Sequence, residues 1–271
     1  MRHFYGQLAN VLIGQTWTTF TDVDAFPDLL DFAGPAGISF LRQPQVRYTY
    51  PVAKGHSVAF AIEKAVVQAP QITSSGGAYT PAPDFVVRYR LDKEIGHIQL
   101  GSLYRVLGYR IETDNEKNFG YAVNASGALD IFGSDRAMAY VMTGRGAARY
   151  IDNISGLNAD VDLNDEGTGV EALPVFGTYA GYTHHWPHRL RSTVVFGYSS
   201  IDNWAAQAAT AYKNGYYTSG NLLFNVAGSL NVGVEYLYGS HKQKDGGKGT
   251  ASRVQFSAKY DLYRKRPVDQ K

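Results

Sequence analysis

Apolar and polar residues alternate strictly over many stretches of this sequence, and no other feature limits its fold as much. The stretch 253–263 is an example, in which Val254, Phe256, Ala258, Tyr260 and Leu262 alternate with Arg253, Gln255, Ser257, Lys259 and Asp261. No long stretch shows the period of about 3.6 residues that an amphipathic helix requires. No apolar run approaches the roughly 18 residues of a transmembrane helix. The sequence therefore predicts an all-β protein.

The predicted strands are long, and their connections alternate in length. We expect twelve strands, at 4–17, 38–50, 57–67, 85–91, 97–109, 118–132, 138–150, 172–183, 190–198, 215–227, 230–240 and 253–263. Most are long enough to cross a bilayer when tilted, which takes about 9–11 residues. Long connections are expected at 18–37, 68–84, 110–117, 151–171, 199–214 and 239–252, with short turns between them. Long loops at one end and short turns at the other are typical of an antiparallel outer-membrane β-barrel.

Composition agrees with this fold class. The 26 Lys and Arg residues nearly balance the 24 Asp and Glu residues, so the net charge does not indicate a nucleic-acid partner. The chain has no cysteine, which excludes disulfides and thiolate chemistry. Its 20 tyrosines fit the aromatic girdles of a membrane barrel. A soluble barrel or sandwich is the alternative, but it would bury its apolar side chains inside and leave the second face unexplained.

Arginines collect on the polar face of the predicted strands. An arginine at mid-depth on the lipid face costs about 2–4 kcal/mol, so we expect these side chains to face a wet lumen. The predicted pore-lining set is Arg47, Arg88, Arg90, Arg105, Arg145, Arg149, Arg191 and Arg253. With Lys259 they outnumber the predicted inward acids, which are Glu63, Asp130, Glu235 and Asp261. A basic wall of this kind would concentrate anions, and guanidinium groups suit carboxylates. The simpler alternative is a polar lining that only keeps the lumen wet.

Several motifs resemble the DcaP-like trimeric porins of Gram-negative outer membranes. They are RHFYGQLANVLIGQTWTTFTD (2–22), DLLDFAGPAG (28–37), ISFLRQPQVRYT (38–49), FAIEKA (60–65), YAGYTHHWPHRLRSTVVFGYS (179–199) and GVEYLYGS (233–240). The resemblance implies a homotrimer in the bacterial outer membrane, in contact with lipid, that lets small hydrophilic solutes diffuse passively. It further implies a bias toward small anionic solutes, with dicarboxylates expected, and no nucleic-acid partner.

The resemblance also gives a role to the acidic stretch 18–37. We expect it to be the constriction loop, which in porins folds into the barrel and narrows it. Its apolar residues Phe26, Leu29, Leu30 and Phe32 would pack on the inner wall, and its carboxylates Asp22, Asp24, Asp28 and Asp31 would face the channel. Opposite charges across the constriction would produce a transverse field. The alternative is an acidic loop exposed at the surface.

The order of the segments predicts an incomplete barrel. A constriction loop normally follows the fifth of sixteen strands, whereas here it follows the first. We therefore expect the C-terminal three-quarters of a porin in residues 1–263, without the first four strands and the signal peptide, followed by a polar tail at 264–271. Strands 4–17 and 253–263 would then be left unpaired. The alternative is a smaller, closed twelve-strand barrel.

Catalytic and metal-binding interpretations are weaker. A phospholipase-like barrel enzyme needs a Ser, a His base and a polar orienting group, and no His-x-Ser-Asn-Gly-type segment is present. No carboxylate or cysteine stands beside His184, His185 and His188 in the sequence to complete a metal site. Pro187 breaks any helix that would align His184 with His188. We predict no catalytic residue, metal ligand or cofactor. A barrel enzyme and a structural or surface-recognition barrel remain as alternatives to a channel.

Overall fold

The computed structural model describes residues 2–72, 76–111, 114–166 and 169–260. The predicted polar tail at 264–271 and the end of the last predicted strand, 261–263, lie outside the described residues. The helical elements in the described ranges are three short 3-10 turns, Val23–Ala25, Ala148–Tyr150 and Asp152–Ile154. None of them is long and apolar enough to cross a membrane.

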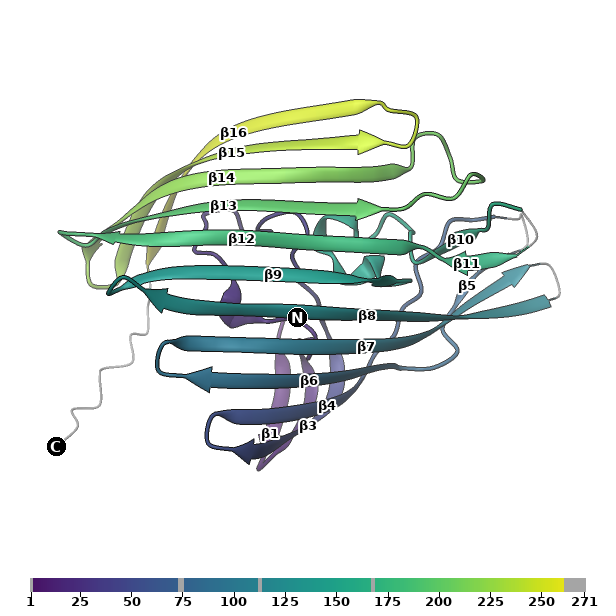
Figure 1. Ribbon diagram of the computed structural model, residues 1–271, viewed down its shortest axis with the longest axis horizontal. Helices are drawn as coiled ribbons and strands as arrows, with labels where there is room; N and C mark the ends of the chain where they lie inside the picture. The colour runs from purple at the N-terminus through teal and green to yellow at the C-terminus, as the bar shows by residue number, and fades with distance from the viewer. Residues whose placement is uncertain (1, 73–75, 112–113, 167–168, 261–271) are drawn as a thin grey trace.

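One large antiparallel sheet forms the body of the molecule, which confirms the all-β prediction (Figure 1). Its strands are β1 (Phe4–Leu8), β2 (Val11–Trp17), β3 (Arg42–Ala53), β4 (His56–Glu63), β6 (Asp84–Lys93), β7 (Gly96–Ile111), β8 (Asp114–Ile131), β9 (Asp135–Arg145), β12 (Pro174–Trp186), β13 (Leu190–Ile201), β14 (Tyr212–Ala227), β15 (Leu230–Gln243) and β16 (Lys248–Tyr260). Each pairs with the next strand in this order, and the short β5 (Gly77–Tyr79) pairs with β7. A separate hairpin joins β10 (Val161–Leu163) to β11 (Val170–Ala172).

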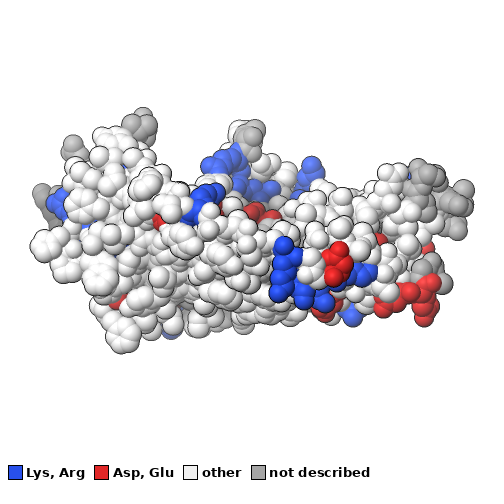
Figure 2. Space-filling model, turned by 90° about the horizontal axis from the view of Figure 1, so that it is seen from above, with Lys and Arg blue, Asp and Glu red and all other residues white. Residues whose placement is uncertain are grey.

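The outer face of the sheet is apolar and exposed. On β4, Phe60 and Ile62 are about half exposed, whereas Ala59 and Ala61 on the other face are buried. Successive side chains of a strand point to opposite faces, so this difference follows directly from the sequence alternation. Figure 2 shows a broad uncoloured surface across the lower left and middle of its view, with few charged side chains. An apolar outer face matches the requirements of a barrel that contacts lipid.

Three of the predicted segments differ in the structure. Segment 4–17 is a hairpin, because the chain reverses at Ala9 and Asn10 and Leu8 pairs with Val11. Segments 110–117 and 239–252 are mostly extensions of the β7–β8 and β15–β16 hairpins. Their polar composition predicts loops, but the backbone pairing of both hairpins continues through these polar residues. The predicted long loops at 18–37, 68–84, 151–171 and 199–214 lie largely between strands at one end of the sheet.

The two edges of the sheet stay apart. Among the described residues β1 pairs with β2, β16 pairs with β15, and no ladder joins β1 to β16. In the described part of the chain β1 and β16 are therefore the two edges of the sheet.

The concave interior is partly filled by loops. Phe20 and Ile38 of the β2–β3 connection are buried together with Tyr150 and Ile151 of the β9–β12 connection. They pack in one cluster with inward side chains of the wall such as Met142. Ile38 also accepts a backbone hydrogen bond from Asp152, which joins the two connections directly. Two connections far apart in the sequence therefore pack against each other and against the wall.

Candidate functional site

The β2–β3 connection, residues 18–41, lies across the inner face of the sheet. The carbonyl of Phe20 accepts a hydrogen bond from Asn124 of β8, and the carbonyl of Ala25 accepts one from Tyr179 of β12. The backbone N–H of Leu30 donates to Glu235 of β15. The segment thus reaches from β2 almost to the opposite edge of the sheet, as expected for an inserted loop rather than one exposed at the surface.

Glycine is required at one point of this path. Gly37 has φ +84°, and a Cβ at this position would lie 2.3 Å from the carbonyl oxygen of Tyr198 and 2.5 Å from the backbone nitrogen of Thr178. Any other residue would displace the loop from β12 and β13. The Gly37 N–H donates to Asn153 of the β9–β12 connection, so the close approach also fixes the second inserted segment.

The loop carboxylates meet the wall arginines. Asp24 lies 2.8 Å from Arg90 of β6, and Asp28 lies 2.5 Å from Arg191 of β13. Asp31 lies 3.1 Å from Arg253 of β16. The sequence predicted that these acids and bases face each other across a constriction. This prediction is wrong for the three pairs, because each acid is in direct contact with its arginine. Their charges are matched by direct contact, so these arginines are less available to anions.

Asp22 is the most deeply buried of the four loop aspartates. Its carboxylate accepts hydrogen bonds from His97 at 2.8 Å and from Ser126 at 2.7 Å, and Arg90 lies 3.4 Å away. Burial of Asp22 opposes its ionisation, but the hydrogen bonds from His97 and Ser126 outweigh this effect and hold its pKa below the ordinary value. Asp22 therefore serves as a charged anchor for the beginning of the loop.

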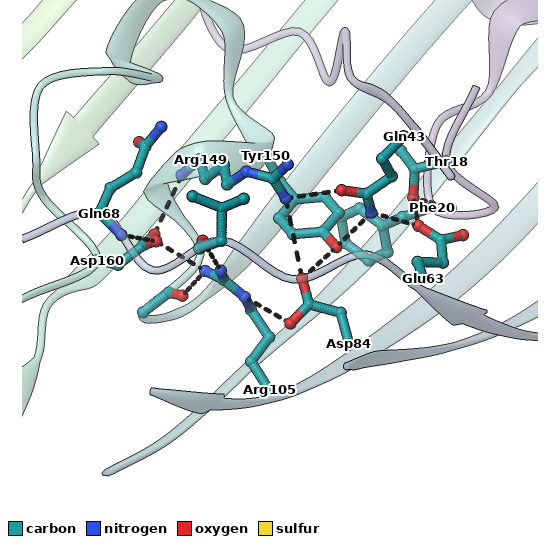
Figure 3. Close-up of polar contacts among 12 residues, drawn as sticks. Thr18, Phe20, Gln43, Glu63, Gln68, Asp84, Arg105, Arg149, Tyr150 and Asp160 are labelled. Carbon is teal, nitrogen blue, oxygen red and sulfur yellow. Dashed lines mark hydrogen bonds and ion pairs between the residues drawn. The ribbon is translucent and has the colours of Figure 1, made fainter. Parts of the chain in front are cut away.

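Arg105 forms a second, fully buried anchor (Figure 3). Its guanidinium group lies 3.1 Å from Asp84 of β6 and 3.0 Å from Asp160 of the β9–β12 connection. It also donates to the carbonyls of Val66 and Gly146. Arg105 is on the inner face, as predicted, but all its contacts hold loop segments against the wall, so it is not free to contact a solute.

Arg149 belongs to the same network. It lies in the 3-10 turn Ala148–Tyr150 instead of in a strand, and its side chain donates to Gln43 at 2.7 Å (Figure 3). The neighbouring Tyr150 donates to Asp84 at 2.8 Å. Burial, together with the nearby carboxylates, raises the pKa of Tyr150 well above its ordinary value, so this hydroxyl remains a donor.

Arg145 lies on the opposite face from the one predicted. It pairs with Tyr121 of β8, whose side chain is exposed, and it shares the outer face of β9 with Val141. Its guanidinium lies 5.9 Å from the ring centre of Trp204 at the long-loop end of the wall. The face was misassigned because Val141 and Met142, on opposite faces of this strand, are both apolar.

Arg47 and Arg88 differ from the other predicted arginines of the inner face. Both lie on the inner face, on β3 and β6, which flank β4. Within the described residues neither forms an ion pair or a hydrogen bond, and the buried Nε of Arg88 has no acceptor. The charges of Arg47 and Arg90 repel the Arg88 guanidinium, and those of Asp22 and Asp92 attract it. The carboxylate of Glu63 attracts Arg47 but already accepts hydrogen bonds from Thr18, Thr19 and Gln43.

A separate inner cavity of about 500 Å³ lies beyond the loop, beside β14–β16. It is lined by Asp31 and Asp152 and does not touch Arg47 or Arg88. Burial and the neighbouring Asp31 raise the pKa of Asp152. No lysine or arginine of the described chain lines this cavity, so the arginine pair is the better candidate for contact with an anion.

Sequence reasoning missed the partners that neutralise most of the arginines. His97, Asp84 and Asp160 were assigned no role, although Asp84 shares the alternating inner face with Val86 and Arg88. The turn histidines form no metal cluster among the described residues, and His184 instead hydrogen-bonds Asp135.

Comparison with known proteins agrees with the fold. A model of the family described as "DcaP outer membrane protein" matches residues 1–262. The outer membrane channel DcaP of Acinetobacter baumannii is 21% identical, with a TM-score of 0.85 over 96% of this chain and 73% of that one. An anion-selective porin from Comamonas acidovorans is 9% identical, with a TM-score of 0.55 over 92% and 72% of the chains. The trimer form of OmpT from Vibrio cholerae is 12% identical, with a TM-score of 0.55 over 92% and 76%. None of the curated proteins matches this chain.

Proposed function

Because this chain belongs to the DcaP outer membrane protein family, we propose that it is a porin for small anions, and that Arg47 and Arg88 contact the anions in transit. The family places the protein in the bacterial outer membrane, and the apolar outer face of the sheet fits contact with lipid there. A channel is favoured over a phospholipase-like enzyme and over a surface-recognition barrel because the matching family and the similar solved structures are outer-membrane channels and porins.

The observation that carries the anion preference is the unmatched charge of two inner-face arginines. The other inner-face members of the predicted set have carboxylates within contact distance, whereas Arg47 and Arg88 have none among the described residues. A buried N–H without an acceptor is costly, so the Nε of Arg88 favours a partner that brings one. A passing carboxylate supplies both the acceptor and the opposite charge.

The spacing of the two arginines favours solutes with two acidic groups. Arg47 pairs across β3–β4 with Ala61, and Arg88 pairs across β4–β6 with Ala59, so two short side chains lie between the guanidinium groups. Each arginine can therefore take one carboxylate of the same molecule. This arrangement supports the dicarboxylates that the sequence resemblance implies as solutes.

We extend the proposal to the assembly and to the loop. The homotrimer is supported by the trimer form of OmpT, which shares the fold. Residues 18–37 are proposed as the constriction loop, because their hydrogen bonds and ion pairs reach β8, β12, β13, β15 and β16 across the inner face. The mass of the purified protein in detergent, measured by native mass spectrometry, tests the trimer.

The test of the anion preference is the reversal potential of the channel in a salt gradient across a planar bilayer. The double variant Arg47→Gln/Arg88→Gln should shift the reversal potential toward zero, because two unmatched positive charges leave the lumen. Arg110→Gln is the matched control, since Arg110 is exposed and hydrogen-bonded to Asn115 on an extended hairpin. An unchanged reversal potential in the double variant, with normal conductance, would refute the role of the arginine pair.

A further inference from the structure

Two lysines lie on the outer face of the sheet at its long-loop end, and a third, exposed lysine lies beside them. Lys242 of β15 and Lys248 of β16 are direct cross-strand partners, and Asn214 of β14 is the other cross-strand neighbour of Lys242. Lys213 lies beside this row, in the irregularity between Tyr212 and Asn214. Figure 2 shows Lys and Arg side chains gathered in the region where β15 turns into β16. Like charges in directly opposite positions destabilise a strand pair, so this arrangement calls for an explanation.

The charges of these lysines are not used inside the protein. Within the described residues none of the three forms an ion pair or a hydrogen bond through its ammonium group. Lys244 in the same turn is different, because its Nζ donates to the carbonyls of Trp204, Ala205 and Gln207. The nearby carboxylate of Asp245 accepts the N–H of Gly247 and carries one negative charge, which leaves the cluster basic.

Below the lysines, the outer-face rows carry first hydroxyl groups and then apolar side chains. This is the order expected from a lipid headgroup region toward the hydrocarbon core. The next outer-face row across β14, β15 and β16 contains Tyr216, Ser240 and Thr250, and the one after it contains Thr218, Tyr238 and Ser252. Farther down, the rows become apolar, with Leu222, Val234 and Phe256 in one of them. Tyrosines belong at the membrane interface, so the lysine row lies just above it.

We propose that Lys213, Lys242 and Lys248 bind the phosphate groups of an anionic glycolipid in the outer leaflet of the membrane. The long loops of outer-membrane barrels are on the external side, so this end of the sheet faces the outer leaflet. Lysine ammonium groups above a tyrosine belt attract lipid phosphates, and the hydroxyl rows below offer partners for sugar hydroxyls. An occupying phosphate also removes the repulsion between Lys242 and Lys248.

The test measures lipid binding to the purified full chain in detergent by native mass spectrometry. The probe is bisphosphorylated lipid A, compared with the same lipid without its phosphates. The variant Lys213→Gln/Lys242→Gln/Lys248→Gln should lose binding of the phosphorylated probe by about tenfold or more. The matched control Lys54→Gln/Lys93→Gln removes two exposed lysines at the short-turn end and should bind as the parent does.

Three results would overturn the proposal. One is equal binding of the phosphorylated probe by the parent and the triple variant. A second is a triple variant that keeps lipid binding but loses its oligomeric mass, because the lysines would then contact a second copy of the chain instead of lipid. Strong binding of the dephosphorylated probe that depends on the lysines would likewise show that phosphate is not the group recognised.

Discussion

The two segments inserted into the barrel are held in different ways. Residues 18–41 are attached at separate points along the sheet, by Asp22 on β7 and β8, by Asp28 on β13 and by Glu235 of β15. In the β9–β12 connection, Arg149, Tyr150 and Asp160 instead belong to one buried network around Arg105, and Asn153 adds a separate attachment to Gly37 and Ser199. Contacts far apart contribute nearly independently, whereas members of one network depend on each other. Single substitutions should therefore loosen the first segment in parts and the second as a whole.

The largest effect is expected for Arg105→Met. It leaves Asp84 and Asp160 buried without their shared cation, which costs about 3–5 kcal/mol when one partner of a buried pair is removed. The free energy of unfolding in urea, measured in detergent micelles, should fall accordingly. Arg110→Met on the same strand is the control and should change it by less than about 0.5 kcal/mol. Similar values for the two variants would mean that the network does not hold the second segment.

A smaller, localised effect is expected for Glu235→Gln. The buried carboxylate accepts hydrogen bonds from the N–H groups of Leu30 and Asp31 and from the side chain of Asn221. Replacing one carboxylate oxygen by an NH₂ group leaves some of these donors without an acceptor, at a cost of about 1–3 kcal/mol. Amide hydrogen exchange should accelerate in residues 28–31 and stay unchanged in 148–154. Equal acceleration in both segments would contradict their independence.

A third prediction uses pH. The pKa of Asp22 lies below its ordinary value of 3.8 in the folded protein, so its contribution to stability is present above that value and is lost as the pH falls through the lowered pKa. Asp22→Asn should therefore flatten the dependence of the unfolding free energy on pH below about pH 4. Urea unfolding between pH 3 and pH 7 measures this slope. The same slope in the variant and the parent would show that Asp22 is not the titrating anchor.

The smallest effect on stability is expected for Asp28→Asn. Asp28 and its partner Arg191 are both partly exposed, so their ion pair contributes about 0–1 kcal/mol to the free energy of unfolding. Because the change leaves Arg191 without its carboxylate, the channel should instead become more anion-selective. A reversal-potential shift with an unchanged unfolding free energy is the expected pair of results. A large loss of stability would place Asp28 among the structural anchors.

The sequence alone predicts the strands and the face of most inner arginines. The alternation of Phe60 and Ile62 with Ala59 and Ala61 is enough to assign these side chains to two faces. Side-chain direction has a period of two in every strand, whatever its tertiary surroundings. It failed for Arg145, since both faces of β9 carry apolar residues. It also missed the hairpin at Ala9, where the two turn residues move the outer face from even to odd positions, so that Leu8 and Val11 share a face.

Only the tertiary structure decides which arginines keep a free charge. Asp22 meets His97, and Asp31 meets Arg253 more than two hundred positions along the chain, through the path of one loop across a curved sheet. A local pattern encodes which face a side chain takes. It cannot encode which distant side chain lies opposite, because that depends on the curvature of the whole sheet and on where loop residues such as Gly37 can approach it. For this reason only two of the eight predicted arginines, Arg47 and Arg88, lie on the inner face without a carboxylate partner among the described residues.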